Sequence, residues 1–214
     1  MHGPDMLFDD EERLFTTRRL DHRVAIALKH VSNGLADLGL ILDAFDPFQL
    51  EGLPVPSRVE RYRLDVSDTR QNLFWQKATT VHNVWGFSSG TPTGEHVGLP
   101  LLNVQYAMPL SVTNTAPVGV PLAFTVTFSM PAEVAAVPVV HSKVQVSWDH
   151  GVTWSGDQTV RCQPAGTDSA GGHPTACSVV VADQHTGLVS LRVTGTDAAG
   201  NTITQTITDA YGVS

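Results

Sequence analysis

Charge is scarce in this sequence, and long hydrophobic runs are absent. Only 16% of the 214 residues are charged, and 13 basic residues stand against 21 acidic ones, for a net charge of −8. Nucleic acids and anionic membranes are bound through basic surfaces, so this balance argues against both as partners. No apolar run approaches the roughly 18 residues of a membrane span. These absences leave an acidic globular chain that is long enough to bury a substantial core.

The N-terminus lacks the features of a secretory signal, which combines a basic start, an apolar stretch and a cleavage site of small residues. Its first twelve residues instead carry five acidic side chains, namely Asp5, Asp9, Asp10, Glu11 and Glu12. We expect residues 1–20 to form a flexible acidic tail. Two expectations follow for the whole chain: a cytoplasmic protein, or a piece of a longer exported protein whose signal lies upstream.

Cysteine occurs only twice, as Cys162 and Cys177, which flank a stretch rich in Gly, Pro, Ser and Thr. Exported β-domains use such a pair as a disulfide staple, worth about 3 kcal/mol for a loop near 15 residues. The alternative is a pair of buried thiols in a reducing compartment. Two cysteines without a nearby histidine pair do not make a four-ligand zinc site. The sequence therefore predicts neither a metal nor a cofactor.

The second half of the chain is rich in β-branched residues. Residues 111–214 contain 18 Val and 15 Thr, types that suit the half-buried surface of a sheet. Apolar and polar residues alternate over 124–129, 144–148, 189–194 and 202–208. A period of two places one side of each strand inward and the other in water. Short strands separated by Gly, Pro and Asp turns at such spacing indicate a β-sandwich.

Strands also outweigh helices in the first half. We predict strands over residues 58–66, 79–88 and 99–106, and Pro and Gly residues exclude a helix between the last two. Residues 24–31 alternate only in part, so they fit either a strand or a short helix.

The junction between the halves falls near residues 111–118, where Asn, Thr and Pro follow the end of a predicted strand. We therefore predict an all-β fold with two consecutive β-sandwich domains, residues 21–112 and residues 113–214. The second domain is predicted to be immunoglobulin-like.

Sequence patterns for catalysis are incomplete. Residues 86–90 match the G-x-S-x-G nucleophile elbow, but that motif needs a helix after the serine. The Thr-Pro-Thr-Gly sequence at 91–94 does not open one. Nine histidines are scattered singly, without an i, i+4 pair or an H-E-x-x-H motif. A Ser/His/Asp site assembled from distant segments stays open as an alternative.

One segment, residues 147–154, resembles the Asp-box hairpin S-x-D-x-G-x-T-W. Its motif residues are Ser147, Asp149, Gly151, Thr153 and Trp154. The carboxylate is expected to accept backbone N–H bonds across the turn, the glycine to take a positive φ, and the last tryptophan to fold back as an apolar anchor. The alternative is that Trp148 and Trp154 form a pair that stacks on sugar rings.

A second segment, residues 196–202, resembles the D-x-x-G-N hairpin that joins the last two strands of many bacterial immunoglobulin-like domains. Asp197 is expected to cap the turn, and Gly200 and Asn201 tolerate left-handed conformations. A calcium-ligand role for Asp197 and Asn201 would supply only two ligand side chains, far short of the about six to eight oxygens that calcium takes.

Further short motifs extend the resemblance over about residues 58–212. In chain order they are Tyr62-Arg63-Leu64, Phe74-Trp75, Thr79, Val84-Trp85-Gly86-Phe87-Ser88 and Leu99-Pro100-Leu101-Leu102-Asn103-Val104-Gln105-Tyr106. Together they resemble the C-terminal, non-catalytic region of large secreted actinobacterial subtilisin-like serine proteases. In that region a sandwich with these motifs precedes an immunoglobulin-like module with the S-x-D-x-G-x-T-W hairpin.

The resemblance implies an extracellular location and an accessory role. That role is expected to be non-enzymatic, because the Asp, H-G-T-H and G-T-S-M-A motifs of the subtilisin site are missing. It implies as partners a catalytic protease domain of the parent chain, a polypeptide or a surface polymer. Two alternatives stay open. One is a carbohydrate-binding module with Trp85, Trp148 or Trp154 exposed as a flat platform. The other is a stand-alone hydrolase with a spatially assembled Ser/His/Asp site.

Overall fold

The computed structural model describes the backbone of residues 22–32 and 35–43, and backbone and side chains over 58–70, 76–90, 98–131, 134–166, 173–182 and 185–214, with only the backbone of Thr159 among them. These residues form twelve β-strands and no helix, so none of their segments is a helix that could cross a membrane. The prediction of an all-β fold is confirmed. The predicted tail, residues 1–20, lies outside the described residues.

The twelve strands vary from two to twelve residues in length. In chain order they are β1 (His22–Ser32), β2 (Leu35–Asp43), β3 (Glu60–Arg70), β4 (Thr80–Ser89), β5 (Asn103–Ala107), β6 (Thr115–Ala116), β7 (Leu122–Ser129), β8 (Val139–Ser147), β9 (Thr159–Pro164), β10 (Thr175–Val181), β11 (Gly187–Asp197) and β12 (Thr202–Val213).

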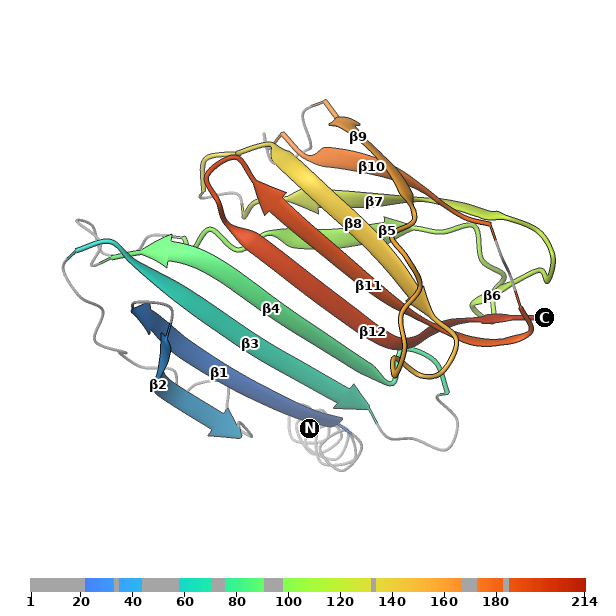
Figure 1. Ribbon diagram of the computed structural model, residues 1–214, viewed down its shortest axis with the longest axis horizontal. Helices are drawn as coiled ribbons and strands as arrows, with labels where there is room; N and C mark the ends of the chain where they lie inside the picture. Colours follow the sequence, from blue (N-terminus) through green and yellow to red (C-terminus); the bar gives the residue numbers. More distant parts are fainter. Residues whose placement is uncertain are drawn as a thin grey trace, which may run out of the picture.

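Two sheets contain all of these strands (Figure 1). The larger sheet has the order β2-β1-β3-β4-β12-β11-β8, and the short β6 pairs with β12 in parallel. The smaller sheet has the order β5-β7-β10-β9 and is antiparallel throughout. Strands β1 and β2 therefore lie at the end of the larger sheet farthest from β8.

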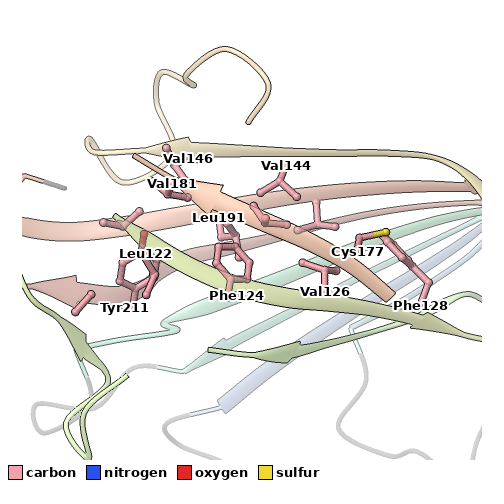
Figure 2. Packing of buried hydrophobic residues seen from close by; sticks show 14 of the residues in the cluster. Leu122, Phe124, Val126, Phe128, Val144, Val146, Cys177, Val181, Leu191 and Tyr211 are labelled. Atoms are coloured by element: carbon pink, nitrogen blue, oxygen red, sulfur yellow. The ribbon is translucent and has the colours of Figure 1, made fainter. Parts of the chain in front are cut away.

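The core lies between the two sheets (Figure 2). Phe124 and Val126 of β7 and Cys177 of β10 face Val144 of β8 and Leu191 of β11, and none of the five is more than 5% exposed. Burying a large apolar side chain contributes about 1.5–3 kcal/mol, so this layer stabilises the pairing of the sheets. Two sheets that share a core between their inner faces form a β-sandwich, as predicted.

The alternation in the sequence corresponds to the two faces of the strands. Nine apolar members of the alternating sets are buried in the core, and Trp148 and Ile207 are half-buried. The nine are Phe124, Val126, Phe128, Val144, Val146, Val189, Leu191, Val193 and Ile203. Residues 24–31, which fitted a strand or a helix, lie in β1 and pair with β2 and β3. The predicted strand over 99–106 is shorter, because Leu101 N donates to the carbonyl of Leu99 in a tight turn before β5 begins.

Hydrogen bonds cross the predicted boundary between residues 112 and 113. Strand β4 pairs with β12 over seven residue pairs, and β5 pairs with β7. Within the described residues, the strands of 21–112 thus join the sheets that residues 113–214 build. The division into two domains and the immunoglobulin-like assignment stay predictions.

Candidate binding surface

The predicted disulfide is present. Cys162 of β9 and Cys177 of β10 are bonded, and they lie directly opposite each other in the antiparallel pair. Cys177 is fully buried in the core, whereas Cys162 is exposed. The bond therefore ties the outermost strand of the smaller sheet to the core of the sandwich.

The segment after β8 forms a tight hairpin held by two short side chains. The hydroxyl of Ser147 donates to Asp149 Oδ1 at 2.7 Å and accepts from Gly151 N at 2.8 Å. The carboxylate of Asp149 also accepts from Thr153 N at 2.8 Å and from the Thr153 hydroxyl. Gly151 has a φ of 87°, as the turn requires. These are the bonds expected of the motif residues.

Hydrogen bonding in this hairpin has an electrostatic consequence. The bonds from Ser147 and Thr153 favour the ionised carboxylate and lower the pKa of Asp149 to about 2. On the other side of the turn, the Trp154 ring lies beneath the guanidinium of Arg192, whose Cζ is 3.9 Å from the ring centroid. A Cβ on Gly151 would come within 3.3 Å of the same ring. The Trp154 ring therefore lies between the turn and Arg192 of β11. Its predicted role as a hydrophobic anchor stays a prediction.

A second link ties this hairpin to the middle of the larger sheet. His150 Nδ1 lies 2.8 Å from Asp209 Oδ1, at a point where β12 bulges and Asp209 has a φ of 55°. The backbone N–H of Asp209 donates to the hydroxyl of Ser190 at 2.9 Å. The bulge is thus held from both sides by polar groups of the neighbouring elements.

The D-x-x-G-N segment joins β11 to β12. Asp197 Oδ1 accepts from the backbone of Ala199 and Asn201, and Asp197 Oδ2 accepts from Asn201 Nδ2 at 2.8 Å. Asp197 is only 2% exposed, and Gly200 has a φ of 83°. Arg61 of β3 donates to the carbonyl of Gly200 at 3.1 Å, so this turn is also linked to the first half of the chain.

The three candidate tryptophans do not come together. Trp85 of β4 packs against the core and donates through Nε1 to the carbonyl of Leu102 at 2.8 Å. Trp148 also packs against the core, with its ring edge-on to His185 at 5.1 Å between centroids. Trp154 alone lies against Arg192, beside the outer side of the sheet. The structure therefore does not form one aromatic platform from these residues.

Strand register defines a polar outer face on the larger sheet, on the side away from the core. We call it the outer face. Its rows across β3, β4, β12, β11 and β8 are Thr69–Thr80–Thr208, then Ser67–His82–Thr206–Arg192–Gln145, then Asp65–Val84–Thr204–Thr194–Lys143, then Arg63–Gly86–Thr202–Thr196–His141, and Arg61–Ser88 at one end. Half of these positions are threonine or serine, and Val84 is the only apolar side chain larger than glycine.

One ion-pair network crosses this face. Asp65 Oδ1 lies 2.5 Å from His82 Nε2, and Asp65 Oδ2 accepts from Arg63 Nη2 at 2.8 Å. Partial burial opposes ionisation of Asp65, but the hydrogen bonds from His82 and Arg63 outweigh it and lower its pKa. The single acidic residue of the outer face is thus neutralised by its neighbours.

Close packing shapes the same face at one point. A Cβ on Gly86 would lie 2.6 Å from the hydroxyl oxygen of Thr202. Glycine at this position therefore lets the threonine hydroxyl approach the backbone of β4. Gly86 also begins the G-x-S-x-G segment, residues 86–90, which lies mainly in strand β4. Ser88 of that segment belongs to the outer face.

Sequence reasoning missed the outer face and both His–Asp pairs. Within the described segments, the histidine hydrogen bonds join carboxylates, His82 to Asp65 and His150 to Asp209, and none joins a serine hydroxyl. The same segments hold no group of three or more potential metal ligands. The regular Thr-x-Thr repeat at 202–208 was the visible signal of the outer face.

Comparison with protein-family models, with curated proteins and with solved structures gave no match.

Proposed function

We propose that this chain is a non-catalytic accessory region of an exported protein, of the kind it resembles in secreted subtilisin-like proteases. Its task is to hold a surface polymer or a polypeptide near a catalytic domain. The outer face carries the proposal. Five strands present polar and cationic side chains on one side of a sheet, and β8, β11 and β12 bury their other side in the core.

Rigid support of the outer face favours a binding role. Its ends are fastened by the two hairpins, one through the Trp154–Arg192 contact and the other through the bond from Arg61 to Gly200. Recognition surfaces gain affinity when their side chains are ordered before binding, because less entropy is lost on association. A sheet held by these two hairpins is a suitable base for such a surface.

The disulfide supports the exported location. Disulfides persist mainly in oxidising compartments, and this one fixes an outer strand to the core.

Serine catalysis by a His-activated hydroxyl needs a hydrogen bond between the two groups. In the described part of the chain the imidazoles of His82 and His150 are engaged with carboxylates, which favours a structural role for both.

Two measurements test this function. Purified chain incubated with casein is expected to leave it intact, with or without a serine-directed inhibitor. In a second assay, the folded chain is expected to sediment with an insoluble bacterial cell-wall preparation, and the heat-denatured chain serves as its control. Casein hydrolysis that the inhibitor abolishes would overturn the proposal.

A further inference from the structure

The outer face differs in charge from the chain as a whole. The chain has 13 basic and 21 acidic residues. The outer face reverses this balance, because its four basic residues, Arg61, Arg63, Lys143 and Arg192, accompany one acidic residue, Asp65. Lys143 pairs with Asp157 of the neighbouring hairpin at 2.8 Å, and even with that carboxylate the face keeps an excess of positive charge.

The cations lie at two margins with hydroxyls between them. Arg61 and Arg63 belong to β3, and Arg192 and Lys143 belong to β11 and β8. Neighbouring strands lie about 4.8 Å apart, so β3 and β11, three strands apart, are separated by about 14 Å. Strands β4 and β12 fill this interval mainly with threonine, together with Ser88, His82, Val84 and Gly86.

We propose that the outer face binds an anionic polysaccharide in which acidic sugars are separated by neutral ones. The inference rests on the proposed accessory function and names the surface polymer that it would hold. Arginine and lysine at the margins meet the carboxylates, with the planar guanidinium suited to two parallel bonds. The threonine hydroxyls between them donate to and accept from the hydroxyls of the neutral sugars.

Other classes of partner fit the outer face less well. Protein interfaces are centred on aromatic and apolar anchors, and the only larger apolar side chain on this face is Val84. Single-stranded nucleic acid needs aromatic stacking platforms, and none of the rows contains an aromatic ring other than His82 and His141. A DNA duplex carries one charge per roughly 1.7 Å, far denser than the cations of this face. A neutral glycan would leave the excess positive charge of this face without a counter-charge.

Binding of hyaluronan, which alternates acidic and neutral sugars, tests the proposal at low and at physiological salt. Dextran, heparin and a DNA duplex serve as the neutral, densely charged and nucleic-acid polymers. We expect the chain to bind hyaluronan and to lose affinity as salt rises, because salt screens exposed charges. Equal binding of dextran, or tighter binding of heparin or of DNA, would overturn the proposal.

Variants separate the outer face from general charge. R61Q/R63Q/K143Q is expected to weaken hyaluronan binding by about tenfold or more, since charge pairs at such a surface guide and hold the partner. R58Q/R70Q/R161Q removes the same number of cations from positions that belong to none of the rows of the outer face, and it is expected to bind like the original chain. Equal losses in the two variants contradict the proposal. Thermal melting verifies that each variant is folded.

The hydroxyl contribution has its own test. T194V/T204V removes two central hydroxyls and keeps β-branched side chains of similar volume and unchanged charge. It is expected to weaken hyaluronan binding severalfold, and unchanged binding contradicts the role of the hydroxyls. Absence of hyaluronan binding while casein stays intact overturns this inference alone. Hydrolysis of casein overturns the accessory function and leaves the binding measurement interpretable.

Discussion

The imidazole of His150 lies 2.8 Å from the carboxylate of Asp209, although the two residues are 59 positions apart. This contact fastens the hairpin after β8 to the bulge in β12. The His150 side chain is 64% exposed and that of Asp209 11%, so solvent screens the interaction from one side. Both residues have a positive φ, of 60° and 55°.

A double-mutant cycle with His150→Gly and Asp209→Gly measures this contact, since glycine accepts both backbone conformations. We expect a coupling energy of about 0.5–1 kcal/mol, the upper part of the range for a partly exposed pair. Urea unfolding of the four proteins gives the value. Strictly additive effects of the two changes would show that the contact contributes nothing.

Acid sensitivity is expected to depend on Asp149. Its pKa is about 2 in the folded chain, below its value of about 3.9 in an unfolded chain. A lowered folded-state pKa contributes stability that is present above about pH 4 and is lost as the pH falls toward about 2. Asp149→Asn should therefore reduce the fall in urea midpoint between about pH 5 and pH 2.5.

The control for this experiment is Asp157→Asn. It removes a carboxylate from the same hairpin, and that carboxylate forms an ion pair with exposed Lys143. This variant is expected to keep the acid sensitivity of the original chain. An undiminished fall in midpoint for Asp149→Asn would contradict the role assigned to the hydrogen bonds of Ser147 and Thr153.

Asp197 and Asn201 form a buried pair in which Asn201 donates and the Asp197 carboxylate accepts. Asp197→Asn keeps an acceptor for the backbone of the turn but places an amide N–H₂ opposite Asn201 Nδ2. We expect a loss of about 1–3 kcal/mol in the free energy of unfolding, the cost of a buried donor without an acceptor. The exchange D197N/N201D restores a donor and an acceptor and should recover part of that loss. No recovery would indicate that the side-chain bond is unimportant.

Gly195 of β11 faces Phe128 of β7 across the core. A Cβ at Gly195 would lie 2.5 Å from Phe128 Cε1, so Gly195→Ala must displace the ring. We expect a loss of about 1–3 kcal/mol, as for other overpacked cores. Gly156→Ala serves as the neutral control, because no atom lies within 4 Å of the Cβ that it adds. Equal melting temperatures of the two variants would show that the core adapts without cost.

Removal of the disulfide is expected to destabilise the chain. Cys162 and Cys177 are 15 positions apart, a loop for which C162A/C177A should lose about 3 kcal/mol in denaturant unfolding. Reduction of the original chain should lower its stability by a similar amount, which separates the crosslink from the change in side-chain volume. Non-reducing mass spectrometry of exported material should show the two cysteines joined, and two free thiols would contradict the exported location.

Prediction from sequence succeeded where the signal is local. Alternation at 124–129 and 189–194 identified residues that are buried in the sandwich, and the cysteine pair lies within one hairpin. The turn residues of 147–154 and 197–201 bond to partners within four positions, so their spacing alone indicated their geometry.

Contacts between distant strands were beyond such reasoning. The pairing of β4 with β12 depends on which hydrophobic faces meet, a choice that no local pattern encodes. The Asp65–His82 and His150–Asp209 pairs follow from that register. Net charge also concealed the outer face, because a sum over the chain does not record which side of a sheet each cation occupies.

Strand β12 lies in the interior of the larger sheet, between β4 and β11, yet it follows every other described strand in the chain. During synthesis, β3 and β4 emerge long before the strand that joins them to the sandwich. Until then β4 has an open edge, which is a template for pairing with another chain. Pairing of strands far apart in sequence is slow, and β-proteins of this kind fold in milliseconds to seconds. A chain truncated before residue 202 would therefore keep this open edge on β4 and is expected to be prone to aggregate.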